Sequence, residues 1–237
     1  ALPSADDRRP LRRTAGVWQA RRPALGSAAL LLVASLYFAL VPSQPFWAAV
    51  LEGRSWLQSS TWLFSAAILA ALVSLNLLLL GLVVNRWTAR PLLALLVVAG
   101  AMASFYTVRF GTVLDPGMMR NALHTEAKEA SDLVGWPLLR HLLVEAGPAL
   151  IFLAWIRVAG GPLGRQLLRR GALVAGAALM LVGSVGFAYQ DLASLFRNQR
   201  EVRYRIAPLN VVYSAGRALT MTPAVASTGR QVVGADV

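Results

Sequence analysis

The polar residues Asn121, Thr125 and Glu129 follow one another at every fourth position, between two long apolar stretches of the chain. Residues four apart lie on one face of a helix, so these side chains form a stripe that offers an amide, a hydroxyl and a carboxylate. Such a stripe could recognise a charged polar group through hydrogen bonds. The alternative is a helix face that is only solvated, as most charged helix faces are.

Basic side chains accompany this stripe and recur further along the chain. Arg120, His124 and Lys128 lie beside the stripe and are weaker candidates for contact with a phosphate. A second basic set precedes Pro208 and consists of Arg197, Arg200, Arg203 and Arg205. We expect this set to contact anionic headgroups, because juxtamembrane arginines attract anionic lipid at about 1 kcal/mol each. An incidental basic flank explains the set equally well.

The helix that carries the stripe has recognisable ends. Asp115 followed by Pro116 is typical of a helix start, and the sequence Gly135-Trp136-Pro137 predicts a stop. From Met118 onward, the apolar residues gather on one half of the helical wheel. An amphipathic helix of this kind is predicted to lie in the headgroup layer of a membrane with its apolar face down.

The composition indicates a membrane protein. Of the 237 residues, 57% are hydrophobic and only 14% are charged, which is too apolar for an ordinary soluble domain. Five segments approach the length of about 20 mostly apolar residues that a membrane span needs. We therefore predict an all-α integral membrane fold, a five-transmembrane-helix bundle with amphipathic periplasmic interfacial helices, whose spans are 23–41, 62–84, 91–108, 136–156 and 171–190.

Two of these spans carry features of their own. The fourth is the weakest, because Arg140, His141 and Glu145 fall in its first half, although such side chains can snorkel to the interface near a helix end. In the fifth span, the spacing of Gly171 and Ala175 would allow close helix packing.

Arginine placement predicts the orientation. Residues 1–22 form a basic segment that is expected in the cytoplasm, because positive charge favours that side. The five spans within 23–190 then put the helical loop 111–135 in the periplasm, and residues 191–237 become a periplasmic juxtamembrane linker. A cleaved signal peptide is the alternative for the first span. Its apolar run is longer than the usual stretch of about 7 to 15 residues, and no small-x-small cleavage site closes it.

Several function classes are excluded by missing motifs. The chain has no cysteine, and its two histidines, His124 and His141, are 17 residues apart and form no HExxH motif, so no metal site is expected. Nucleophile-elbow, P-loop and dinucleotide motifs are absent from the sequence. The net charge of +12 occurs without a basic stripe interleaved with aromatic residues, so nucleic acid is not an expected partner.

Two segments resemble the lipid A phosphoethanolamine transferases, the family that includes the mobile colistin-resistance enzymes. They are DPGMMRNALHTEAKEA at residues 115–130 and FRNQREVRYRIAPLN at residues 196–210. The resemblance extends over roughly residues 18–237. It implies a multi-pass protein of the inner (cytoplasmic) membrane of a Gram-negative cell, which moves phosphoethanolamine from phosphatidylethanolamine to lipid A and so confers polymyxin (colistin) resistance. The resemblance also places Asn121, Thr125 and Glu129 in a set that contacts the phosphatidylethanolamine headgroup.

The same resemblance implies a further domain of the same polypeptide. In the family, a periplasmic alkaline-phosphatase-like domain carries zinc and a threonine nucleophile. We expect that domain to be missing from these residues, which would hold no cofactor and no catalytic residue and would be inactive alone. The expected partners are phosphatidylethanolamine, lipid A and the catalytic domain.

Two other functions were weighed against a transferase membrane domain. One is a five-span membrane scaffold or sensor module without catalytic activity, which the sequence leaves open. The other is a small transporter, which is disfavoured because charge within the spans is confined to the start of the fourth.

Overall fold

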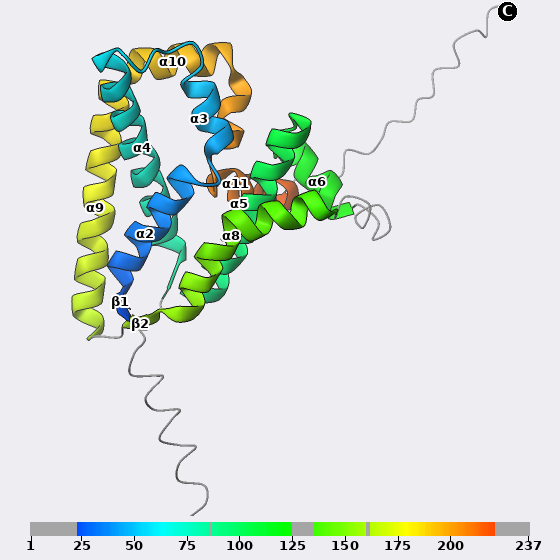
Figure 1. The fold of residues 1–237 in the computed structure, drawn as a ribbon. Coiled ribbons are helices and arrows are strands. Elements are labelled where there is room, and N and C mark those ends of the chain that lie inside the picture. Colours follow the sequence, from blue (N-terminus) through cyan, green and yellow to red (C-terminus); the bar gives the residue numbers. More distant parts are fainter. Residues whose placement is uncertain (1–22, 86, 125–134, 160–161, 221–237) are drawn as a thin grey trace, which may run out of the picture.

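The computed structural model describes residues 23–85, 87–124, 135–159 and 162–220 (Figure 1). Long helices dominate these ranges, which confirms the predicted helical membrane fold. The elements in chain order are β1 (Ala24–Gly26), α2 (Ser27–Leu40), α3 (Gln44–Val50), α4 (Ser59–Val83), α5 (Ala89–Phe110), α6 (Pro116–His124), α8 (Trp136–Trp155), β2 (Arg157–Ala159), α9 (Leu163–Phe187), α10 (Tyr189–Asn198), the 3-10 helix η2 (Arg200–Arg205) and α11 (Leu209–Thr220).

Four helices in the described part are long and apolar enough to cross a membrane: α4, α5, α8 and α9. The first predicted span, 23–41, is not one continuous helix. α2 has 14 residues and is followed, after a bend of 56°, by α3, so the two together form a fifth, broken candidate span. Pro42 lies in this bend and explains it, because proline removes a backbone donor and clashes with the preceding turn; Pro45 lies in the first turn of α3, where proline is tolerated.

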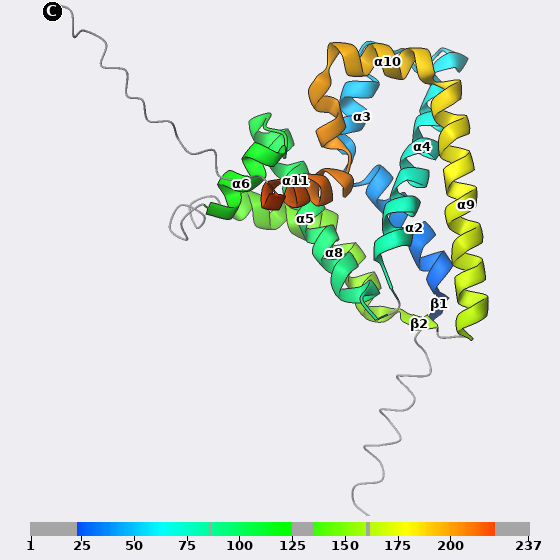
Figure 2. The same cartoon turned by 180° about the vertical axis from the view of Figure 1, so that it is seen from behind.

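The spans form two groups, as the two opposite views show (Figures 1 and 2). α4 packs against both α2 and α9, and α5 packs against α8. The two groups are joined at one end, where β1 and β2 pair in parallel with Leu25 opposite Val158, and α2 also contacts α5. This pair of short strands was not expected from the sequence. We call the end with the strands the inner end and the opposite end the outer end. The helices at the outer end form what we call the outer layer, namely α3, α6, α10, η2 and α11.

Two clusters of buried side chains hold this arrangement. The larger one joins the inner parts of α2, α4, α5 and α8 around residues such as Leu30, Leu80 and Leu93. The smaller one lies under the outer layer, where Phe46 of α3 and Ile68 of α4 meet residues of α10 and η2. The outer layer is therefore packed onto the spans by its own apolar core.

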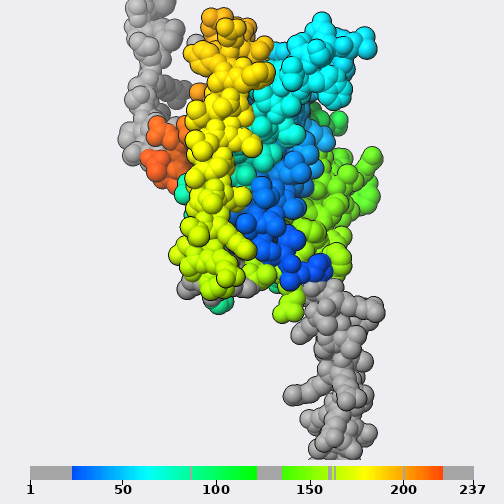
Figure 3. Space-filling view, turned by 90° about the vertical axis from the view of Figure 1, so that its left-hand side faces the viewer, coloured from blue at the N-terminus to red at the C-terminus, as the bar shows by residue number. Residues whose placement is uncertain are grey.

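α9 lies at the edge of the bundle. Figure 3 shows it as a continuous column beside α4 and α2, and only 6% of its most apolar stretch is buried. It approaches α4 closely at Gly81, where an added Cβ would lie 2.9 Å from Val174 Cγ2. The spacing of Gly171 and Ala175 makes no such contact with the described residues, because Gly171 is exposed and an added Cβ would have no neighbour within 4 Å.

Candidate functional site

The helix predicted to carry the polar stripe begins where the sequence indicated. Asp115 Oδ1 accepts a hydrogen bond of 2.7 Å from the Met118 backbone N–H, and Pro116 occupies the first helical position. Asn121 lies exposed on α6, and Arg120 beside it is half-buried. Of the predicted stripe, the structure therefore describes Asn121, as an exposed residue of α6.

The other predicted residues of this segment are described only in part. His124 is the last residue of α6, and nothing is described of its side chain. Thr125, Lys128 and Glu129 lie outside the described residues. Their roles stay predictions that rest on their spacing from Asn121.

α6 is held in place by α11, a helix that the sequence prediction treated as part of a linker. The hydroxyl of Ser214 donates a hydrogen bond of 2.7 Å to the carbonyl of Leu114, just before α6. The buried face of α11 consists of Asn210, Ser214 and Ala218, whereas Leu219 is 79% exposed. A helix that faces lipid typically buries small and polar residues against the protein and exposes apolar residues. The spacing of these buried residues, four apart, was the available signal.

The position of α11 depends in turn on Ser43 in the bend between α2 and α3. Ser43 is fully buried; its hydroxyl donates to the Phe38 carbonyl at 2.8 Å and accepts from the Ala207 backbone N–H at 3.1 Å. Ala207 lies just before α11. The Ser43 side chain therefore connects the broken first span to the turn before α11. Because α11 holds α6, this contact also helps to orient α6.

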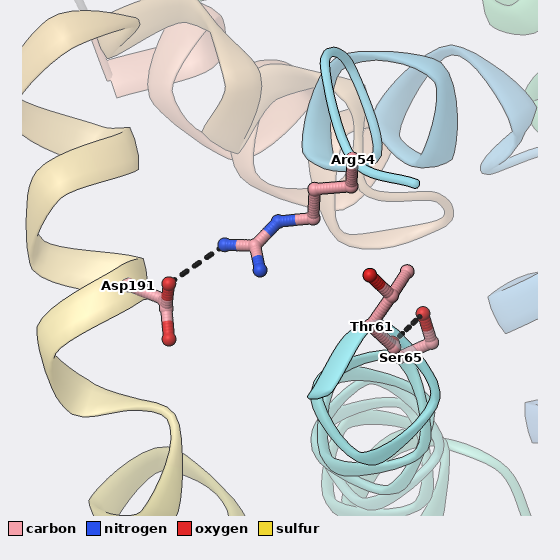
Figure 4. Close-up of polar contacts among 4 residues, drawn as sticks. All are labelled: Arg54, Thr61, Ser65 and Asp191. Carbon is pink, nitrogen blue, oxygen red and sulfur yellow. Dashed lines mark hydrogen bonds and ion pairs between the residues drawn. The ribbon is translucent and has the colours of Figure 1, made fainter. Parts of the chain in front are cut away.

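A second contact fixes the start of α10 (Figure 4). Arg54, in the loop after α3, forms an ion pair of 2.7 Å with Asp191 in the first turn of α10, and its guanidinium lies 3.8 Å from the centre of the Phe64 ring. Within α4, the Ser65 hydroxyl donates to the Thr61 carbonyl at 2.7 Å. Because the two ionic side chains are 30% and 49% exposed, the pair positions α10 more than it stabilises the fold.

The basic set of the tail lies on the connection between α10 and α11. Arg197 is exposed in the last turn of α10, and Arg200 begins η2. Arg203 is exposed and donates to the Tyr204 hydroxyl at 3.2 Å, while Arg205 is half-buried. η2 packs against α11, which packs against α6, so the tail arginines and the stripe helix belong to one outer layer.

Sequence reasoning missed a polar cluster in the outer half of α8. Arg140 is exposed, as snorkelling predicts, but Glu145 is only 8% exposed, and its Oε2 lies 3.2 Å from His141 Nε2. Tyr37 of α2 donates to the Glu145 backbone carbonyl at 3.2 Å, and the buried Ser104 of α5 lies beside the carboxylate. The cluster joins three spans, and the spacing of His141 and Glu145 on one helix face was the signal for it.

The part of the chain that the structure describes contains no group of side chains suited to bind a metal ion. Among those residues, no three His, Asp or Glu side chains gather closely enough to hold a metal ion. The described residues do not fit a zinc site, and no reaction step through zinc is assigned to them.

Comparison with known proteins agrees with this architecture. Residues 72–222, more than half of the chain, match the family model of the phosphoethanolamine transferases EptA/EptB. The phosphatidylethanolamine transferase Mcr-1 of Escherichia coli is 31% identical over 149 residues, which are 62% of this chain and 27% of that protein. The phosphoethanolamine transferase EptA of Escherichia coli K12 is 28% identical over 197 residues, which are 82% of this chain and 36% of that protein.

A solved structure supports the same relationship. The integral membrane lipooligosaccharide phosphoethanolamine transferase A (EptA) from Neisseria meningitidis superposes with a TM-score of 0.74 at 28% identity, covering 82% of this chain and 36% of its own. The chain thus spans between 27% and 36% of the length of these relatives. With a family match over most of its spans and a helical membrane fold shared with a solved member, the chain belongs to the phosphoethanolamine transferase EptA/EptB family and corresponds to its membrane domain.

Proposed function

We propose that this membrane domain binds phosphatidylethanolamine and presents its headgroup for the transfer of phosphoethanolamine to lipid A. The observation that carries the proposal is the placement of α6, which exposes Asn121 while Ser214 of α11 fixes its start. Both helices fall within the residues that match the family. The names of the relatives, phosphatidylethanolamine and phosphoethanolamine transferases, support the same donor.

Each member of the stripe has a separate role in this proposal. Phosphatidylethanolamine offers an ammonium and a phosphate, and Glu129 pairs with the ammonium, because a charge-assisted hydrogen bond is roughly twice as strong as a neutral one. Thr125 and Asn121 orient the headgroup. Arg120, His124 and Lys128 are the weaker candidates for contact with its phosphate.

The proposal places the transfer at the periplasmic face of the inner membrane. The N-terminus is cytoplasmic and the C-terminus periplasmic, as the arginine bias predicts. A zinc-dependent catalytic domain of the same polypeptide supplies the nucleophile, and the basic set Arg197, Arg200, Arg203 and Arg205 holds that domain against anionic headgroups. The share of the relatives' length that this chain leaves uncovered is consistent with such a domain.

The test uses the full-length enzyme in a Gram-negative host without a transferase of its own, with lipid A measured by mass spectrometry. Glu129→Gln preserves shape and removes charge, and the loss of a contact worth about 1.5–3 kcal/mol should reduce transfer at least tenfold. Asn121→Ala should reduce transfer less. Asn198→Ala changes another exposed asparagine, on α10, and is the matched control.

Two outcomes would contradict the proposal in different ways. Normal transfer by both Glu129→Gln and Asn121→Ala would mean that the stripe is only a solvated helix face. If the unmutated enzyme is expressed in the membrane and leaves lipid A unmodified, lipid A is not its acceptor, and the scaffold or sensor function is favoured.

A further inference from the structure

A cavity between the outer ends of α5 and α8 contains two arginines that have no role so far. It has a volume of about 470 Å³ and is lined by Arg109 of α5 and by Arg140 and His141 of α8. Neither guanidinium has an ion pair or hydrogen bond with any of the residues that the structure describes. Two arginines beside one cavity form a strong site for phosphate, because each guanidinium can donate two parallel hydrogen bonds to its oxygens.

The cavity lies at the outer ends of α5 and α8, where a membrane span meets the lipid headgroups. It lies at the last turn of α5 and the first two turns of α8. Two large aromatic side chains flank it in sequence and are exposed, Phe110 by 57% and Trp136 by 71%. Tryptophan is enriched at the membrane–water interface, so Trp136 indicates that the arginines lie at the level of a lipid phosphate.

A second, apolar cavity lies further along α8 toward the inner end. It has a volume of about 300 Å³, lies between α2, α5 and α8, and shares Val144 with the first. Its lining on α8 extends from Val144 to Leu153, which corresponds to about 13 Å along the helix axis. Both volumes lie in or near the range of ligand sites, about 300–1,000 Å³.

The polar cluster of α8 stands where the two cavities adjoin. His141 lines the first cavity, and Glu145 and Tyr37 line the second. Beyond their mutual contact, the buried atoms His141 Nε2 and Glu145 Oε2 have no well-aligned hydrogen bond with the described residues. The cluster lies at the depth of the ester region of a lipid, which is between its phosphate and its acyl chains.

We propose that these joined cavities bind one phospholipid molecule, with its phosphate between Arg109 and Arg140 and one acyl chain in the cavity between α2, α5 and α8. The arginines recognise the phosphate, and this recognition does not require an amine in the lipid headgroup. The site therefore accepts phospholipids with or without ethanolamine. It is made by the walls of the spans, and none of its described lining residues belongs to α6. The proposal goes beyond phosphoethanolamine transfer and does not require it.

The test measures lipid binding to the purified 237-residue chain in detergent by native mass spectrometry. The probe is dioleoylphosphatidylglycerol, which has a phosphate and no amine, so its binding does not depend on recognition of an ammonium. Arg109→Gln combined with Arg140→Gln should weaken its binding at least tenfold. Arg157→Gln, which removes an exposed arginine of β2 at the inner end, should change it less than twofold.

Three further measurements separate the parts of the proposal. Dioleoylglycerol, which lacks the phosphate, should bind the unmutated chain at least tenfold more weakly than the phosphatidylglycerol probe. Inorganic phosphate at the concentration of the probe should not displace it, because it cannot use the apolar cavity. Ala149→Phe, which fills the apolar cavity and leaves both arginines in place, should also weaken probe binding.

The contradicting results are equally specific. Unchanged binding after both arginines are replaced, or an equal loss with Arg157→Gln, would remove the phosphate site. Displacement by inorganic phosphate would show a site for the free ion. Normal binding to Ala149→Phe would remove the acyl chain from its cavity, a result that does not depend on how the arginine variant folds.

Discussion

Replacement of Ser43 by alanine should loosen one part of the outer layer and leave the spans intact. The change removes the hydroxyl that accepts from the Ala207 N–H and donates to the Phe38 carbonyl. Ala207 is 1% exposed, so its N–H would be left without a partner and without water. An unsatisfied buried donor costs about 1–3 kcal/mol, which is the expected loss in the free energy of opening the turn before α11.

Hydrogen exchange measured by mass spectrometry reports this loss locally. In peptides from α11, amide exchange should become roughly 5- to 150-fold faster, the factor that corresponds to about 1–3 kcal/mol. The segment before α6 should follow, because Leu114 is bonded to Ser214 of α11. α4 and α9 should exchange as before. Ser60→Ala, at an exposed serine near the start of α4, is the control. Unchanged exchange in α11, or an equal rise in all helices, would refute the proposed linkage through Ser43.

Three other predictions concern packing, the outer ion pair and orientation. Gly81→Ala should lower the thermal midpoint of unfolding, because overpacking costs about 1–3 kcal/mol and outweighs a helix-propensity gain of about 1 kcal/mol. Adding Val174→Ala to this variant should restore the midpoint. A failure to restore it would contradict the close contact between Gly81 and Val174. A double-mutant cycle of Arg54→Gln and Asp191→Asn should give a coupling of about 0.2–1 kcal/mol, and a larger value would show that the pair is more than a positioning contact. Alkaline phosphatase fused after Val237 should be active and a fluorescent protein that folds only in the cytoplasm should be dark, whereas the opposite pair of results would reverse the orientation.

Hydropathy located the long spans because it sums a strong signal over many residues. α4, α5 and α8 begin and end within a few residues of the predicted segments. Hydropathy summed over a segment cannot detect a bend when the residues on both sides of it are apolar. The first span was therefore predicted as one helix. Pro42 was the local signal, and its effect on the backbone could have been used.

The candidate site was predictable only where its contacts are local. The start of α6 depends on Asp115 and Pro116, which are adjacent in sequence to the helix they begin. α11 was missed because its buried face is small and polar, and a search for apolar residues passes over such a face. The bond between Ser43 and Ala207 joins distant parts of the chain, and no local pattern encodes it.

Photo-crosslinking tests most directly whether the predicted stripe, which begins at Asn121 of α6, contacts the donor headgroup. A benzophenone amino acid in place of Gly117, which is exposed one turn before Asn121 on the same helix face, leaves the stripe itself unchanged. The full-length protein is reconstituted in vesicles whose phosphatidylethanolamine carries an isotopic label in the ethanolamine. We predict strong labelling from position 117 and weak labelling when the same group replaces Gln58, which is exposed at the outer end of α4. Equal labelling from the two positions, or none from position 117, would contradict a headgroup site on this helix.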